Sequence, residues 1–198
     1  MSDKELKEYV KELLVKYDYY EPLKEREEAL KLAQVSGKKV LDMGTGKGWL
    51  AILAAKNYKC KVTSIDTSEE NLRIAKENAK KDNVEDKIKF LQVDARKTDF
   101  KGNSFDIVIA FNLLHHMKGD YLPAIKEMFR ISKHKVIITE LNKAGAEVFD
   151  NYIYPEEKHS KMALDLDNMA RVLSKYGTVS RHDRKIMSTF ICLKNRGV

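Results

Sequence analysis

The sequence predicts an α/β fold: a doubly wound, mostly parallel sheet with an antiparallel hairpin at its C-terminal edge and a helical cap at the N-terminus. Short runs rich in Val and Ile alternate with segments of helical periodicity between residues 38 and 141, and this alternation is typical of a parallel sheet. Near the C-terminus, two strand-like runs follow one another with a short connection. Such a connection requires an antiparallel pair.

The composition is that of one globular domain. The chain has 198 residues, of which 43% are hydrophobic and 34% charged, with a net charge of +7. We expect a single domain over 1–198, with a cap over 1–36 and a core over 37–198. No apolar run reaches the roughly 20 residues that cross a bilayer, and the charged N-terminus is unlike a secretory signal. We therefore expect a cytoplasmic protein with no membrane partner, in which Cys60 and Cys192 are buried, reduced thiols.

The cap is predicted to contain two helices. Apolar residues recur at helical spacing over 3–17, and a second helical segment, roughly 24–35, ends at Gly37. The aromatic stretch KYDYYEP lies between them.

The core is predicted to alternate in order along the chain. We expect strands at 39–43, 60–66, 87–94, 102–111 (with an initial turn) and 135–141, and helices at 48–57, 68–82 and 120–132. The helix at 68–82 opens with Thr67-Ser68-Glu69-Glu70, a capping-box pattern. A helix at about 163–176, ending at Gly177, precedes the two final strands at 178–185 and 187–195.

The turn after the first strand indicates a ligand site. In VLDMGTGKGWL, Gly44, Gly46 and Gly48 follow an acid, Asp42. Glycine lets the backbone approach a ligand and adopts positive φ. A phosphate loop would need G-x-x-x-x-G-K-[ST], but Leu41 stands where the first glycine would be.

Two classes of cofactor remain after the phosphate loop is set aside. A dinucleotide site needs G-x-G-x-x-G, and its third glycine would fall on Trp49. An acid before the loop also suits an anionic pyrophosphate poorly. A cofactor that lacks phosphate and carries an ammonium, as S-adenosylmethionine does, is compatible with Asp42.

The motif Asp42-x-Gly44-x-Gly46-x-Gly48 resembles the first motif of the class I S-adenosylmethionine-dependent methyltransferases, which have a Rossmann-like core. The resemblance covers roughly 38–195. It implies that Asp66, at the end of the second strand, holds the ribose hydroxyls and that Asp94, with Ala95, lies near adenine. We expect S-adenosylmethionine as cofactor, bound by these residues and by Thr45, Thr67 and Asn112; Gly48 is equally consistent with helix packing.

Further residues follow from the resemblance to quinone-biosynthesis members of the family. FNLLHHM, after the fourth strand, is similar to the active-site rim of that family, and it makes His116 or His115 a candidate base or acceptor contact; packing beneath the rim is the alternative. Tyr17 is a candidate cover for the cofactor, although ordinary helix packing explains it equally well.

No metal site is expected from the sequence. Neighbouring residues do not face the same way on a helix or strand, so His115 and His116 are not expected to share an ion. Glu140, Asn142 and the DLDN run at 165–168 do not match a magnesium-dependent pattern, since Asn112 ends the fourth strand.

The acceptor is expected to be a small molecule. The stretch after the fourth strand lacks the Asn/Asp-Pro-Pro-Tyr type motif that holds planar amides in enzymes acting on bases or glutamine. Charges such as Arg181, Arg184 and Lys185 fit protection of an edge strand better than an RNA patch. The alternatives are an RNA or protein methyltransferase, and a non-catalytic module that binds S-adenosylmethionine.

Overall fold

The computed structural model describes Glu5, Glu8, Tyr9, Glu12 and the ranges 21–117, 119–154 and 156–195. The helix predicted over 3–17 therefore lies largely outside the described residues, as does Tyr17 with the aromatic stretch around it. Within the described ranges no helix is long and apolar enough to cross a membrane.

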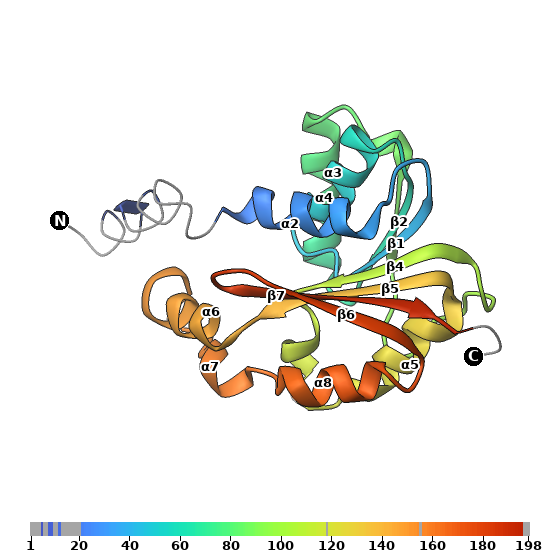
Figure 1. Ribbon diagram of the computed structural model, residues 1–198. Coiled ribbons are helices and arrows are strands. Elements are labelled where there is room, and N and C mark those ends of the chain that lie inside the picture. The colour runs from blue at the N-terminus through green and yellow to red at the C-terminus, as the bar shows by residue number, and fades with distance from the viewer. Residues whose placement is uncertain are drawn as a thin grey trace.

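A seven-stranded sheet forms the centre of the molecule, in the order β3-β2-β1-β4-β5-β7-β6 (Figure 1). The first five strands are parallel, and β7 pairs antiparallel with both β5 and β6. This confirms the predicted doubly wound sheet with a reversed edge hairpin. The strands are β1 (Lys39–Met43), β2 (Lys61–Asp66), β3 (Ile88–Gln92), β4 (Phe105–Phe111), β5 (Ser132–Leu141), β6 (Gly177–Asp183) and β7 (Met187–Lys194).

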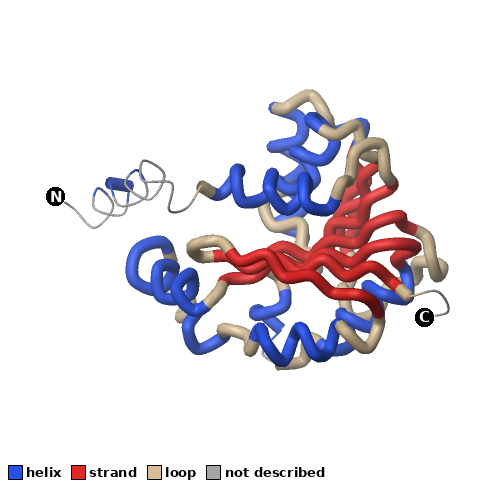
Figure 2. The backbone as a smooth tube through the Cα atoms, in the orientation of Figure 1, coloured by secondary structure: helices blue, strands red, loops and turns tan. Residues whose placement is uncertain are grey.

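Helices cover both faces of the sheet, as Figure 2 shows. One layer holds α2 (Pro22–Ala33), α3 (Trp49–Asn57) and α4 (Glu69–Lys81); the other holds α5 (Leu122–Ile131) and α8 (Leu166–Leu173). Each layer has its own apolar cluster against the sheet, with Leu30 and Ile52 in one and Met128 and Met169 in the other. Burial on both faces explains why the central strands read as unbroken Val and Ile runs.

Three predicted helix boundaries are wrong, each for a local reason. Helix α2 ends before Gln34, whose φ of 56° makes it the left-handed cap expected at Gly37. Helix α4 is capped by Ser68, which accepts a hydrogen bond from the Asn71 amide, and not by Thr67. The single helix predicted over 163–176 begins only at Leu166, because the Asp165 side chain caps the Asn168 amide.

The sequence reading missed the helical segment between β5 and α8. Helix α6 (Lys143–Val148) continues into a π-helical turn (Phe149–Ile153), and α7 (His159–Met162) follows. These pieces follow β5 in the chain and lie beyond its carboxyl end (Figure 1). Short π-helical turns occur often at functional sites.

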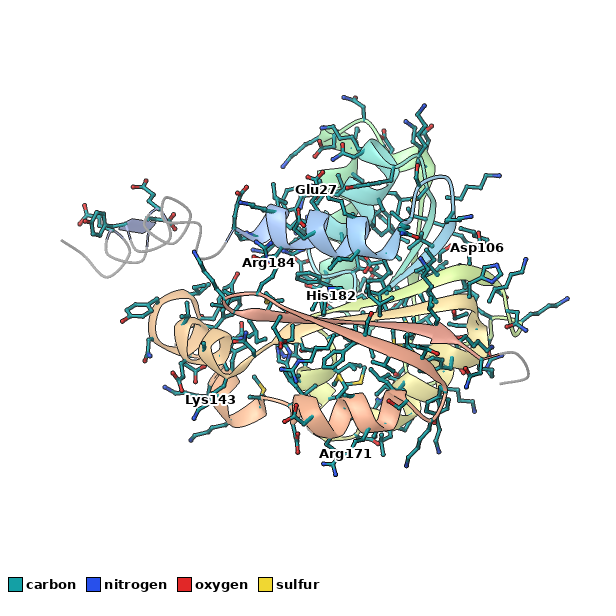
Figure 3. All side chains as sticks on the ribbon, in the orientation of Figure 1. Glu27, Asp106, Lys143, Arg171, His182 and Arg184 are labelled. Atoms are coloured by element: carbon teal, nitrogen blue, oxygen red, sulfur yellow. The ribbon has the colours of Figure 1, made fainter. Side chains whose placement is uncertain are left out.

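The edge hairpin carries the predicted charges, and two of them, Arg181 and Arg184, form ion pairs. Arg181 of β6 ion-pairs with Asp167 and Asp183. Arg184, labelled beside α2 in Figure 3, ion-pairs with the buried Glu25 at 3.0 Å. The edge charges therefore hold neighbouring elements in place. Both cysteines are buried and free, as expected.

Candidate active site

The site lies at the carboxyl ends of β1 and β4, where the order of the strands reverses. Ligands bind at this point in open α/β sheets. Two cavities, of about 340 Å³ and about 500 Å³, meet there and share Gly44 and His116. The smaller is lined on the β2 and β3 side by Ile65, Asp66, Thr67, Val93, Asp94, Ala95 and Arg96. The larger is lined by residues that include Arg26, Asp42, Thr45, Gly46, Trp49, Asn112, His115, Phe149, Tyr154, Glu157 and His159.

The glycine turn presents backbone without a side chain at Gly44, where the two cavities meet. Gly44 has a φ of +89°, and a Cβ there would lie 2.9 Å from Cδ1 of Leu113. Its amide and that of Thr45 both donate to the Ile65 carbonyl, at 2.8 and 3.0 Å. The turn is thus fixed to β2 while its surface stays open to a ligand.

Gly48 packs between helices. Its φ is +84°, and an added Cβ would lie 2.9 Å from Cβ and 3.1 Å from Cα of Ala75 on α4. The sequence left open whether Gly48 serves helix packing, and the structure confirms that role. Gly48 lines neither cavity. Contact of Gly48 with a cofactor stays a prediction.

Separate substitutions of Gly48 and Gly46 are expected to affect different properties: the first mainly the stability of the protein, the second mainly ligand binding. Gly48→Ala should lower the free energy of unfolding by roughly 2–4 kcal/mol, since it adds overpacking to a positive φ. A Cβ added at Gly46 would meet open space, and the φ there is +48°. Gly46→Ala should therefore lower the free energy of unfolding by only about 1 kcal/mol while weakening cofactor binding. Urea unfolding and calorimetric titration measure the two effects; equal stability of the two variants would contradict the packing role.

Asp42 is a buried carboxylate with few partners. It is 1% exposed, and among the described residues it accepts one hydrogen bond, from the Ser64 hydroxyl at 2.7 Å. Ser64 in turn lies 2.7 Å from the hydroxyl of Thr45. Burial raises the pKa of Asp42 to about 7, against the opposing effects of the Ser64 hydrogen bond and the Arg26 charge. A cationic ligand group in the larger cavity would compensate this charge.

Asn112 holds a second polar atom ready for a ligand. The residue has a φ of 51°, unusual for a non-glycine residue, and its amide donates to the Thr139 carbonyl. Its Oδ1 is buried without a hydrogen-bond partner. An unpaired buried acceptor in a cavity suits a ligand that offers an ammonium donor.

Asp66 connects the glycine turn to α4. One carboxylate oxygen accepts from the Gly46 amide at 2.9 Å and from Asn71 Nδ2 at 3.3 Å, and the other accepts from the Ser68 amide at 2.9 Å. A carboxylate has about four acceptor positions. With three hydrogen bonds accepted from described residues, Asp66 retains roughly one further acceptor position, and its contact with the ribose hydroxyls stays a prediction.

Asp94 is engaged by a residue that the sequence analysis missed. Arg96 pairs with both oxygens of Asp94, at distances of 2.7 to 3.1 Å, and lines the smaller cavity. The Arg96 hydrogen bonds hold the pKa of Asp94 below its usual range. An adenine contact by Asp94 stays a prediction. Arg96 belongs to no recognised sequence motif. Its role in the cavity wall comes from its ion pair with Asp94, two positions earlier.

Glu140 fixes the segment that carries the histidines. It is 1% exposed, and one oxygen accepts from the amides of Leu113 and Leu114 at 3.2 and 2.7 Å. The other oxygen lies 2.6 Å from Nδ1 of His115. Because a carboxylate accepts, this contact places the imidazole proton on Nδ1 of His115. Nε2 then carries no proton in the neutral ring. The Nε2 atom is buried and has no partner.

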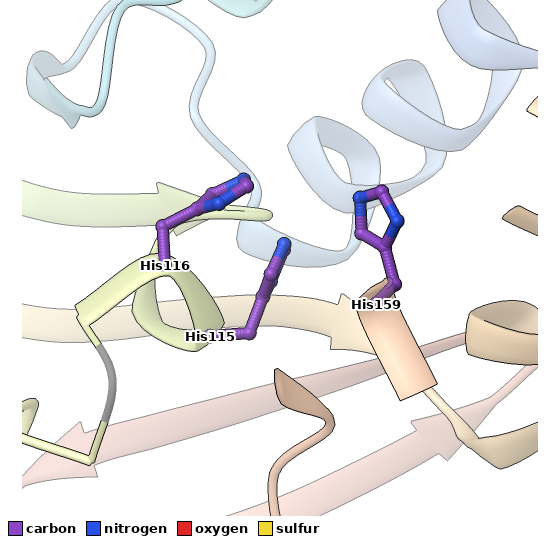
Figure 4. Close-up of side chains that lie close together, drawn as sticks. All are labelled: His115, His116 and His159. Carbon is purple, nitrogen blue, oxygen red and sulfur yellow. The ribbon is translucent and has the colours of Figure 1, made fainter. Parts of the chain in front are cut away.

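The expectation that His115 and His116 point apart is wrong. They lie on a 3₁₀ turn (Leu114–Met117), and their ring centroids are 4.0 Å apart. His159, from the start of α7, joins them with centroid distances of 5.5 and 6.2 Å (Figure 4). Burial and the other two histidines lower the pKa of His116 to about 4, so its imidazole is neutral at neutral pH. His159 came from a segment without a recognisable motif.

The residues considered for a magnesium site have other contacts. Asn142 caps α6 by accepting from the Gly145 amide, and Asp165 caps α8. Asp167 pairs with Arg181. Only Glu140 of that set contacts the site, through His115.

Proteins similar to this chain include several methyltransferases. Residues 40–135 match a family model described as a methyltransferase domain. The chain is 40% identical over 119 residues to the demethylmenaquinone methyltransferase of Staphylococcus aureus, covering 57% of this chain and 47% of that protein. It is 30% identical over 139 residues to the ribosomal protein L11 methyltransferase of Lactobacillus acidophilus, covering 69% and 38%.

The fold is shared with solved structures. A SAM-dependent methyltransferase from Aquifex aeolicus aligns with a TM-score of 0.69 at 21% identity, over 86% of this chain and 89% of that one. Among the first curated relatives, this chain covers between 30% and 64% of the length of the protein it matches.

The fold is an α/β sheet whose two cavities lie at the switch point of the strand order, where the candidate site is placed. Residues 40–135 match a methyltransferase domain, and the fold is shared with solved S-adenosylmethionine-dependent methyltransferases, as the resemblance in the sequence predicts. The residues present fit that cofactor: Gly44 lines both cavities, while buried Asp42 and the unpaired Oδ1 of Asn112 suit an ammonium.

Proposed function

We propose that this protein transfers a methyl group from S-adenosylmethionine to a small-molecule acceptor by in-line displacement. The observation that carries the proposal is the junction of two cavities at Gly44 and His116. One cavity has the acids that suit an adenosine. The other has the buried carboxylate that suits the ammonium, and beyond it a space edged by histidines and aromatic rings.

The smaller cavity is assigned to the adenosine. Asp66 offers its remaining acceptor position to the ribose, next to Thr67, and Asp94 with Ala95 borders the adenine end. Gly46 is held against Asp66 by its amide hydrogen bond. The glycine turn and the ribose acid therefore form one unit.

The larger cavity is assigned to the amino-acid portion of the cofactor and to the acceptor. Asp42 and Asn112 bind the ammonium, with Thr45 supporting Asp42 through Ser64. The acceptor occupies the part of the cavity bordered by His115 and His116.

When bound, S-adenosylmethionine supplies a methyl group already activated by its sulfonium. The chain has to orient the acceptor and exclude water. His115 and His116 contact the acceptor's reacting end, and Phe149 and Tyr154 of the α6–α7 segment limit the access of water. The size of the cavity, about 500 Å³, lies within the range of small-molecule sites.

A macromolecular acceptor is the second candidate, and one relative's name, ribosomal protein L11 methyltransferase, favours it. RNA affinity that falls steeply with salt and exceeds that for other polyanions would support an RNA acceptor. Cofactor binding with no turnover on any acceptor in a broad panel would support a non-catalytic module.

Parallel calorimetric titration with S-adenosylmethionine, S-adenosylhomocysteine and NAD tests the cofactor assignment first. We expect micromolar binding of the two adenosylated ligands and none of NAD. Binding of NAD alone would overturn the proposal. A screen of small hydroxyl, thiol and amine acceptors with radiolabelled cofactor then tests the transfer.

Asp66→Ala is expected to weaken S-adenosylhomocysteine binding about 10- to 100-fold, because a hydrogen bond to a charged group contributes roughly 1.5–3 kcal/mol. A 2′-deoxy analogue separates ribose contact from loop support: it should bind wild type weakly and lose little further affinity in the variant. Asp86→Ala, at an exposed acid on the turn before β3, is the control. Unchanged affinity in Asp66→Ala would contradict the ribose assignment.

A further inference from the structure

We propose that His115, His116 and His159 bind one divalent transition-metal ion in the wall of the larger cavity. The three residues each offer a ring nitrogen, and these nitrogens all lie within 4.8 Å of one another. Figure 4 shows the three rings gathered around one space, two from the turn after β4 and one from α7. All three side chains line the same cavity.

The distances are close to those that a metal needs. Three nitrogens bound tetrahedrally at about 2.1 Å from zinc lie about 3.4 Å apart. Side-chain rotations that bring the nitrogens together by up to about 1.4 Å are therefore enough, since 4.8 Å is the largest separation. Three protein ligands leave the fourth position open, as in catalytic zinc sites.

His115 has the hydrogen-bonding pattern of a metal ligand. Glu140 holds its Nδ1 at 2.6 Å, and its Nε2 is buried without a partner. Metal-binding histidines commonly donate their other ring N–H to a carboxylate, which fixes the tautomer and makes the ligand nitrogen more basic. A buried imidazole nitrogen with no partner otherwise costs free energy, and a metal ion would satisfy it.

His159 has a carboxylate near each of its two ring nitrogens. Its Nδ1 lies 3.5 Å from Oδ1 of Asp150, and both atoms are buried with no hydrogen-bond partner. A small rotation would join them, with Nδ1 donating, and leave Nε2 as the ligand. The Nε2 atom lies 3.2 Å from Oε2 of Glu157, which lines the same cavity. Glu157 therefore adds negative charge beside the ion.

Neutral imidazole favours zinc and other late first-row ions over magnesium or calcium, which prefer oxygen ligands. The open position faces the space assigned to the acceptor, so this part of the inference rests on the proposed function. Coordination of an acceptor hydroxyl or thiol lowers its pKa, and its proton leaves to solvent. The heteroatom's electron pair then forms the bond to the methyl carbon while the carbon–sulfur bond breaks, with its pair going to sulfur.

Cobalt(II) titration of tag-free, chelator-treated protein tests the site directly, because a tetrahedral cobalt site gives intense visible absorption. We expect one ion per chain, displaced by zinc. His159→Ala and His116→Ala should each weaken binding at least 100-fold and remove the visible band. His134→Ala and His182→Ala, at exposed histidines outside the cluster, should behave as wild type. Glu140→Gln, a change in a positioning residue, should weaken binding about 10- to 100-fold.

Absence of the visible band in wild type, or its persistence in His159→Ala, would overturn the metal site. S-adenosylhomocysteine titration on the same samples separates this result from the proposed function. Cofactor binding without metal binding overturns only the metal site, whereas metal binding without cofactor binding overturns only the methyltransferase proposal.

Discussion

Replacing Asp42 by asparagine is expected to stabilise the ligand-free protein at pH 8 and to weaken S-adenosylmethionine binding about 100-fold. Both effects come from one buried charge. In the free protein, Ser64 is the one described residue that donates a hydrogen bond to the carboxylate to compensate its burial. In the proposed complex the cofactor's ammonium adds a countercharge, and the variant is expected to lose a charge-assisted hydrogen bond of roughly 1.5–3 kcal/mol.

The sign of the pH dependence follows from the raised pKa. Asp42 has a pKa of about 7 in the folded protein and 3.8 as its ordinary value, with burial as the main cause. The folded state therefore binds a proton more tightly, and the wild-type protein loses stability as pH rises from about 4 to 7. The stabilisation by Asp42→Asn should be near zero below pH 4 and reach roughly 2–4 kcal/mol above pH 7.

Cofactor affinity should change with pH in the opposite direction. Binding of an ammonium requires the charged carboxylate, so wild-type affinity should fall about tenfold for each pH unit below 7. The variant should show no such dependence between pH 5.5 and 7. Asp106→Asn is the matched control, because Asp106 lies at the amino end of β4 and accepts from the Lys39 amide (Figure 3). Wild-type affinity in Asp42→Asn would exclude an ammonium contact.

The parts of this fold that sequence predicts well are those with local signals. Runs such as VLDM and FDIVIAF are buried on both faces, so their composition alone marks them as central strands. The glycine turn is equally predictable from the sequence. A positive φ at Gly44 and the close approach of Leu113 restrict that position to glycine.

The histidine cluster depends on contacts that are distant in sequence. The rule that neighbouring side chains diverge applies to regular helices and strands, whereas Leu114–Met117 is a 3₁₀ turn whose first amide is held by Glu140. His159 reaches this turn from a segment broken into α6, a π-helical turn and α7. The helical pieces of this segment are too short for their periodicity to be recognised in the sequence. The contact between His159 and His115 could not be predicted for the same reason.

Truncating Glu140 to alanine is expected to lower the free energy of unfolding by about 3–5 kcal/mol. The change leaves the amides of Leu113 and Leu114 and Nδ1 of His115 without their acceptor in a buried environment, and each loss costs roughly 1–3 kcal/mol. Glu140→Gln keeps an oxygen for the amides and should cost less. The exposed Glu147 of α6 provides the control, since Glu147→Ala should stay within about 0.5 kcal/mol of wild type.

Urea unfolding measures all three variants, and the comparison connects stability to the site. In Glu140→Gln the amide group faces Nδ1 of His115, which then has to accept and carry its proton on Nε2 instead. The backbone of the turn is preserved while the ring nitrogen that faces the cavity changes from acceptor to donor. A folded Glu140→Gln protein with normal cofactor affinity but lost turnover would place Glu140 as the residue that orients His115. Wild-type stability in Glu140→Ala would instead mean that the turn does not depend on this carboxylate.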